Sequence, residues 1–220
     1  MIRITNLRKR LSAAFTLQIP SLTIADGERV ALIDPNGSGK STLLRMLANV
    51  IPPDEGEIEL SLPKEKIGYQ PQSPYIFKGT VELNVRLGLH GNADPETCIR
   101  QCGLEALRSQ KASMLSGGER QRLCLCRMLA GSYGLLLLDE PLSAADIETG
   151  EKLEKVLSDH CDSTGTGLVI ATHLPKQALH IATKILILNR GEIAEYGSAE
   201  ELRSPRSEFG QRFLSQWKWE

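Results

Sequence analysis

The loop at residues 34–42 carries residue types that can bind phosphate. It follows the apolar run 30–33 and precedes the apolar segment 43–48, so the pattern predicts a strand, a tight glycine loop and a helix. Gly37 and Gly39 allow the backbone to approach an oxyanion closely, and the helix N-terminus adds partial positive charge. The loop is therefore predicted to bind the phosphates of a nucleotide.

The side chains of this loop have separate roles in the phosphate-loop pattern G-x-x-x-x-G-K-[ST]. Lys40 can reach the terminal phosphates, and the Ser41 hydroxyl can ligate Mg²⁺. A Gly- and Ser-rich turn before an ordinary helix is the alternative, but Gly-Lys-Ser-Thr between a buried strand and an apolar helix favours nucleotide binding. The predicted nucleotide-binding residues of the loop are Asn36, Gly37, Ser38, Gly39, Lys40, Ser41 and Thr42.

The first position of the pattern holds Asp34, where glycine is expected. Pro35 favours extended geometry at residue 34, so a side chain can be accommodated there. A carboxylate about 6 Å from a phosphate charge costs about 3 kcal/mol at an effective dielectric constant near 20, or about a hundredfold in affinity. The cost falls towards zero if Asp34 points away from the phosphates or faces Mg²⁺ or a lysine. The sequence predicts ATP binding that is weakened but retained.

Acidic residues follow a second buried run, the four leucines at 135–138. Asp139 and Glu140 are predicted to lie at the C-terminal end of a parallel strand, which is the ligand edge of an open α/β sheet. There Asp139 can hold Mg²⁺ through water, and Glu140 is the candidate general base for an attacking water. A solvated strand end is the alternative; the four leucines and Pro141 argue against it.

Two further polar segments suit the same chemistry. Gln72 can ligate Mg²⁺ or orient the water, and an ordinary loop amide is the alternative. Gln70 is its rival in the same loop, but the spacing favours Gln72. Ser116-Gly117-Gly118 opens a predicted helix and forms a second possible anion nest, although one chain needs only one nest for its own nucleotide.

Composition and charge bound the remaining possibilities. The 220 residues are 41% hydrophobic and 24% charged, and 26 Lys and Arg against 27 Asp and Glu give a net charge of −1. Because there is no basic excess, no nucleic-acid partner is expected. No apolar run or leader segment suits a membrane or a secretory route, so a cytosolic location is expected unless a partner holds the chain at a membrane. Five cysteines without metal-ligand spacing are predicted to be reduced thiols.

The rest of the chain is predicted from hydrophobic periodicity. Residues 1–25 should form antiparallel strands, residues 85–114 a small helical insert, and the tail at 209–219 a helix that packs back on the core. The other predicted helices are 40–49, one opening at 116, and 147–160; the other predicted strands are 57–60, 66–69, 168–171 and 185–188.

In the order and spacing of these motifs the chain resembles the ATP-binding subunit of an ABC transporter, over essentially its whole length. The matching segments are the phosphate loop at 34–42, the Q-loop glutamine Gln72, the family signature at 115–119, the Walker B strand at 135–140, the D-loop at 143–146, with Ala145 where leucine is usual, and the switch histidine His173.

The resemblance implies an α/β fold with a RecA-like P-loop NTPase core, a mainly parallel sheet, an antiparallel β subdomain and a small helical subdomain. One ABC ATPase domain would span residues 1–220. Residues 1–84 and 128–220 would form the catalytic core with the antiparallel subdomain, and residues 85–127 the helical subdomain that carries the signature.

The resemblance also assigns roles to residues. Glu140, His173 and Gln72 would be catalytic, with His173 at the γ-phosphate; a strand-end hydrogen bond is the alternative for this histidine. Two subunits would sandwich two ATP molecules, with Ser116, Gly117 and Gly118 facing the nucleotide of the opposing subunit. The residues expected to hold Mg²⁺ are Ser41, Gln72 and Asp139.

The family usually stacks adenine on an aromatic residue early in the chain. Leu11 stands at that position here and is the expected adenine contact, and Phe15 is the nearest aromatic residue. Leu11 can pack on a base but lacks the aromatic contribution. For Phe15 a plain core position is favoured over a stacking role.

The function implied is ATP hydrolysis by a homodimer that powers solute transport through a separate integral-membrane permease, at the inner face of a prokaryotic membrane. The permease would dock on residues 73–77 and the helical insert, and a solute-binding protein would act through it. Residues 74–81 look similar to importers of small oxyanions such as tungstate or phosphate. Two alternatives stay open: a soluble ABC ATPase acting on DNA or ribosomes, and a non-hydrolysing or weakly active regulatory module, made plausible by Asp34.

Overall fold

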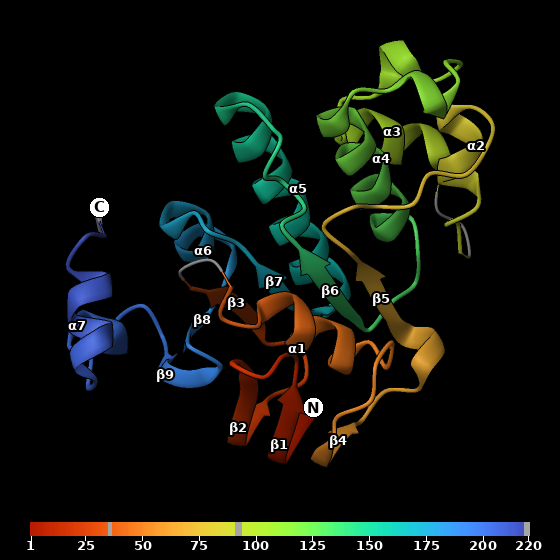
Figure 1. The fold of residues 1–220 in the computed structure, drawn as a ribbon. Coiled ribbons are helices and arrows are strands. Elements are labelled where there is room, and N and C mark those ends of the chain that lie inside the picture. The colour runs from red at the N-terminus through yellow and green to blue at the C-terminus, as the bar shows by residue number, and fades with distance from the viewer. Residues whose placement is uncertain (35–36, 91–93, 218–220) are drawn as a thin grey trace.

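A six-stranded sheet has the order β5-β6-β7-β3-β8-β9 (Figure 1), and its central strands are continuous apolar runs buried on both faces. The structure is a computed structural model, and it describes residues 1–34, 37–90 and 94–217. The first five strands of this order are parallel to their neighbours, and the sixth is antiparallel. The strands are β3 (Arg29–Ile33), β5 (Ile67–Gln70), β6 (Leu135–Asp139), β7 (Gly167–Ala171), β8 (Lys184–Asn189) and β9 (Glu192–Gly197).

A second sheet of three antiparallel strands lies below it in Figure 1, in the order β2-β1-β4. Its strands are β1 (Ile2–Arg10), β2 (Thr16–Ile24) and β4 (Glu55–Leu60). Helix α1 (Lys40–Leu47) lies between the two sheets, and its buried residues share one hydrophobic cluster with residues of β1, β2 and β3. The antiparallel strands predicted within residues 1–25 are confirmed.

The opposite face of the large sheet is covered by helices. Alternate residues of one strand enter the two cores: Val30 and Leu32 pack on the α1 side, whereas Ala31 and Ile33 pack on the other. The covering helices are α4 (Gly117–Leu129), α5 (Ile147–Thr164), α6 (Pro175–Ile181) and α7 (Glu208–Leu214). Helix α5 continues to Thr164, beyond the predicted end at 160, and stops where Gly165 adopts a φ of 70°.

The tail forms helix α7 as predicted, and Trp217 beyond it is buried in the same core. Trp219 lies outside the described residues. No helix in the described part of the chain is long and apolar enough to cross a membrane.

Helices α2 (Val81–Arg86) and α3 (Pro95–Gln101) pack with α4 at the far end of the molecule from the small sheet (Figure 1). The side chains of Thr80 and Asp94 cap the N-termini of α2 and α3, respectively. The predicted subdomain boundaries at 84/85 and 127/128 fall inside α2 and α4, and the division into subdomains stays a prediction. The remaining short 3₁₀ turns are η1 (Lys64–Lys66), η2 (Glu105–Leu107), η3 (Ala112–Met114) and η4 (Glu201–Arg203).

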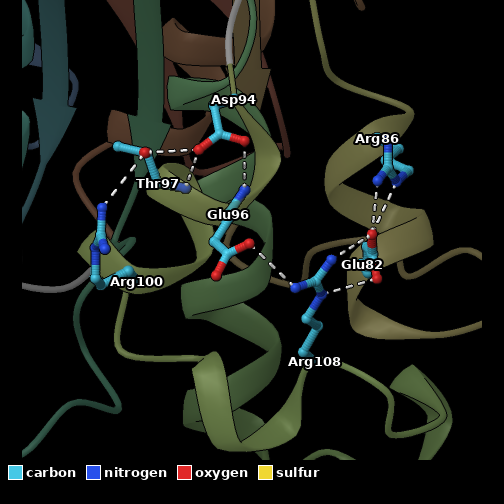
Figure 2. Close-up of polar contacts among 7 residues, drawn as sticks. All are labelled: Glu82, Arg86, Asp94, Glu96, Thr97, Arg100 and Arg108. Carbon is cyan, nitrogen blue, oxygen red and sulfur yellow. Dashed lines mark hydrogen bonds and ion pairs between the residues drawn. The ribbon is translucent and has the colours of Figure 1, made fainter.

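Ion pairs join these helical elements, as Figure 2 shows. Arg108, next to η2, donates to Glu82 of α2 from Nε and Nη2 at 2.9 Å and to Glu96 of α3 at 3.3 Å. Arg86 donates to the same Glu82 carboxylate at 2.7 Å. One carboxylate on α2 therefore serves two arginines, and Arg108 links three elements.

Candidate nucleotide-binding site

The phosphate loop connects β3 to α1 and has the conformation that its glycines permit. Gly37 and Gly39 adopt φ values of 90° and 109°, in the region that residues with a Cβ rarely enter. A Cβ on Gly39 would also lie 3.1 Å from Cδ1 of Leu17. Gly39 therefore combines a left-handed backbone with close packing, and it directs the chain into α1 at Lys40. The predicted residue Asn36 lies outside the described residues.

Asp34 points into this loop. Its side chain is only 1% exposed and forms an ion pair with Lys40, whose side chain is 7% exposed. The other carboxylate oxygen accepts a hydrogen bond from the backbone N–H of Ser38 at 3.2 Å. Of the orientations that the sequence left open, the structure has the carboxylate facing a lysine.

A cavity of about 420 Å³ opens over the loop. Residues of the phosphate loop line it together with Gln72 and Glu140, which lie far from the loop in sequence. Its lining residues are Leu11, Phe15, Asp34, Gly37, Gly39, Lys40, Ser41, Thr42, Gln72 and Glu140. Leu11 is 46% exposed, and Phe15 both lines the cavity and packs against the core cluster around α1.

Three polar residues meet around Glu140, which lines this cavity together with Gln72. Gln72 donates from Nε2 to Oε2 of Glu140 at 3.3 Å. Nδ1 of His173 lies 3.7 Å from the same Glu140 oxygen. The three residues predicted to be catalytic come from the loops after β5, β6 and β7, so the C-terminal edge of the parallel sheet assembles them.

The two glutamines of the loop differ in burial. Gln70 is the last residue of β5 and is 2% exposed, and its amide atoms have no hydrogen-bond partner among the described residues. Gln72 lies two residues further on, lines the cavity and contacts Glu140. The structure favours Gln72 over Gln70 at the site.

Oxygen donors suited to Mg²⁺ lie beside Lys40. Burial raises the pKa of Asp139 above its usual value, and the nearby Ser41 hydroxyl offsets part of this rise. Burial lowers the pKa of Lys40, whereas the nearby Glu140 and Asp139 carboxylates raise it. A hydroxyl, a carboxylate and the Gln72 amide are the ligand types that Mg²⁺ prefers, so these residues fit the ion.

The signature residues lie elsewhere. Ser116 caps α4 in a reciprocal capping box: its hydroxyl accepts from the backbone N–H of Glu119 at 3.4 Å, and its own N–H donates to the Glu119 carboxylate at 2.7 Å. Gly117 is exposed, and a Cβ there would meet nothing within 4 Å. Within the described ranges, none of Ser116, Gly117 and Gly118 lines the phosphate cavity.

Two residues that sequence reasoning missed connect the signature helix to the site. Gln121 donates to the Ser143 hydroxyl at 3.1 Å and accepts from the backbone N–H of Ala144 at 3.2 Å, which fastens α4 to the segment after Glu140. Arg127 donates to the Tyr75 carbonyl at 2.9 Å and lies 4.9 Å from the Phe77 ring centroid. Both are polar residues inside a helix, and nothing in their spacing distinguishes them from a solvated helical face.

Comparison with curated proteins places this site in a known family. The family model described as ABC transporter matches residues 17–143. The sulfate/thiosulfate import ATP-binding protein CysA 2 of Chromobacterium violaceum is 37% identical over 97% of this chain and 63% of its own length. The protein named CysA in Synechocystis sp. is 34% identical over 98% of this chain and 66% of its own length. The chain spans less than two thirds of the length of these relatives.

Solved structures agree with the family match. A dimeric post-hydrolysis structure of the ATP-binding cassette MJ0796, bound to ADP and Pi, has a TM-score of 0.77 at 27% identity, covering 90% of this chain and 98% of that one. A bacterial Atm1-family ABC exporter with ATP bound shares the fold, with a TM-score of 0.84 at 23% identity, over 99% of this chain and 42% of that one. The predicted RecA-like cassette fold is confirmed. The chain therefore belongs to the ABC transporter family, as an ATP-binding ABC ATPase cassette.

Proposed function

We propose that this chain binds and hydrolyses ATP as a homodimer and powers solute import through a separate integral-membrane permease. One observation carries the hydrolytic part: Glu140 contacts both Gln72 and His173 at the cavity that Lys40 and Ser41 also line. A base, a water-orienting amide and an imidazole thus converge beside a phosphate loop. This combination suits phosphoryl transfer to water.

In this proposal the residues divide the work of binding and hydrolysis, and Gln72 has two tasks. Glu140 accepts a proton from the attacking water, Gln72 orients that water, and His173 donates to the γ-phosphate. Lys40 and the loop N–H groups hold the phosphates. Mg²⁺, held by Ser41, Gln72 and Asp139, would supply positive charge to the phosphate oxygens. Leu11 and Phe15 are positioned at the cavity wall to contact the base.

The dimer completes the site. Ser116, Gly117 and Gly118 open a 13-residue helix but lie outside the phosphate cavity of their own chain. A second copy, related by a twofold axis, would present these residues to the nucleotide. The dimeric cassette structure named above, which is bound to ADP and Pi, supports the dimer.

The permease, its location and its cargo are proposed by analogy with relatives named as import ATP-binding proteins. We place the chain on the inner face of a prokaryotic membrane, with Tyr75 (69% exposed) and Phe77 on the permease-docking surface. A solute-binding protein would deliver the solute to the permease. The cargo class is a small oxyanion, and the relatives named for sulfate/thiosulfate import favour sulfur oxyanions over the tungstate or phosphate that residues 74–81 suggested.

Two measurements on the purified chain test the proposal. Phosphate release from ATP in Mg²⁺ buffer should be measurable and should disappear in EDTA. A multi-spanning membrane protein should co-purify from membranes of the native host. Nucleotide binding without phosphate release would instead support the weakly active regulatory module, which the Asp34–Lys40 ion pair favours.

A further inference from the structure

We infer that the Asp34 carboxylate is an internal anion that holds Lys40 and the Ser38 N–H in the nucleotide-free protein and must release them when a nucleotide binds. The inference rests on the proposed nucleotide binding at this loop. It makes Asp34 a determinant of nucleotide affinity that acts by competition.

The geometry shows which groups the carboxylate holds. Its two oxygens are divided between the Lys40 ammonium and the backbone N–H of Ser38. Lysine and backbone N–H groups of a phosphate loop are the donors that bind nucleotide phosphates. The Ser38 N–H is a single donor, so it cannot bind a phosphate oxygen fully while it donates to Asp34.

Burial strengthens the attraction between Asp34 and Lys40. The side chains of Asp34 and Lys40 are 1% and 7% exposed, so water screens their attraction little. Beside them the Ser38 hydroxyl is also buried and has no partner among the described residues. The phosphate loop therefore already contains one carboxylate and the Ser38 hydroxyl where a phosphate would bind.

Competition and repulsion at a distance predict different results. A carboxylate that only repels phosphate lowers nucleotide affinity and contributes nothing to the stability of the nucleotide-free protein. A carboxylate that pairs with Lys40 contributes to that stability, because its removal leaves a buried ammonium without its partner. Removing Asp34 should therefore change stability and nucleotide affinity in opposite directions.

The test uses Asp34→Asn and Asp34→Gly in the full chain. Asn keeps the size of the side chain and an acceptor for Ser38, whereas Gly restores the usual residue of the phosphate-loop pattern. We expect the melting temperature without nucleotide, in EDTA, to fall by about 5 °C or more. We expect the Kd for ATP with Mg²⁺, measured by calorimetric titration, to fall at least about tenfold in both variants.

Asp54→Asn is the matched control. Asp54 also pairs with a lysine, Lys9, at 2.7 Å, but it is exposed and lies outside the phosphate cavity. Its substitution should leave the Kd for ATP unchanged.

Three outcomes would overturn the inference. Equal Kd values in the parent and both variants would show that Asp34 does not compete. A tighter Kd with an unchanged or higher melting temperature would show repulsion without an internal ion pair. Absence of ATP binding in the parent and in both variants would overturn the proposed function as well, which separates that failure from the first two.

Discussion

At the scale of single residues, Glu140 is held by both its backbone and its side chain. It adopts a φ of 50°, a left-handed conformation that non-glycine residues rarely occupy and that is often found at functional sites. Its N–H donates to the Ala171 carbonyl at 3.0 Å, and its carboxylate contacts Gln72 and His173. The hydrogen bond to the neighbouring strand thus fixes the backbone of Glu140, and its side chain lines the cavity.

Replacing Glu140 by Gln tests its role as the base. The amide has nearly the same shape but cannot accept a proton, so ATP turnover should fall at least about a hundredfold while the Kd for ATP changes little. Phosphate release and calorimetric titration measure the two effects. Glu148→Gln, at an exposed ion pair with Lys152 on α5, is the control and should keep parental turnover. Turnover equal to the parent in Glu140→Gln would remove the residue from this role.

The limits of sequence reasoning are also clearest at this scale. Lys40, Ser41 and Glu140 could be placed because a motif fixes their spacing relative to a strand end. The orientation of Asp34 could not be placed, because its spacing was compatible with a lysine, a metal ion or solvent. The contacts of Gln121 and Arg127 depend on which loops pack against α4, and that information is absent from local periodicity.

At the scale of elements, the start of α4 packs tightly against the loop that follows Glu140. A Cβ on Gly118 would lie 2.6 Å from the Ala144 carbonyl oxygen, which belongs to the backbone and cannot easily move. Gln121, one turn further along α4, bonds to Ser143 and Ala144 of the same loop. The signature helix and the loop carrying the D-loop motif are therefore held together by close packing and two hydrogen bonds.

Gly118→Ala and Gly117→Ala form a matched pair for this contact. Gly118→Ala should lower the melting temperature by several degrees, because overpacking costs about 1–3 kcal/mol and each kcal/mol shifts the melting temperature by about 2–4 °C in a chain of this size. Gly117→Ala, where a Cβ meets nothing within 4 Å, should leave it within about 1 °C of the parent or raise it. Differential scanning calorimetry without nucleotide decides; equal melting temperatures for the two variants would contradict the packing.

The ion pairs of the helical elements predict a pH dependence (Figure 2). Hydrogen bonds from Arg108 and then Arg86 lower the pKa of Glu82 from 4.5 to about 2. Because the folded pKa lies below the unfolded one, the stabilisation is fully present above about pH 4.5 and is lost as the pH falls towards 2. The melting temperature of the parent should therefore exceed that of Glu82→Gln at pH 7, and the gap should shrink below about pH 4.5.

Arg108→Gln provides the check on this interpretation. When Arg108→Gln is already present, adding Glu82→Gln should lower the melting temperature at pH 7 by less than it does in the parent, because the two substitutions remove the same interaction. An effect of Glu82→Gln that is constant from pH 7 to pH 3, or that is additive with Arg108→Gln, would contradict it.

At the scale of the whole molecule, the order of strands determines which loops lie side by side at the site. β3 lies between β7 and β8, so the phosphate loop after β3 lies next to His173 after β7, and β6 places Asp139 and Glu140 one strand further on. Apolar runs identified most of these strands. Hydrophobic periodicity is a local signal, however, and does not show that β3 pairs with strands more than 130 residues later in the sequence. The family resemblance implied a mainly parallel sheet, but not which strands pair with β3.

The two helix starts proposed to bind nucleotide phosphates lie apart in one chain, because the start of α4 does not line the phosphate cavity. This predicts nucleotide-dependent dimerisation. Glu140→Gln with ATP and Mg²⁺ should change from monomer to dimer in sedimentation velocity, because blocked hydrolysis keeps the nucleotide between two copies. Adding Gly117→Arg places a long side chain on the exposed start of α4 and should keep the protein monomeric under the same conditions. Ser163→Arg, exposed near the C-terminal end of α5, adds the same side chain elsewhere and should leave the dimer intact. A dimer that persists with Gly117→Arg would place the interface away from the signature residues, and each copy would then have to bind and hydrolyse ATP without them.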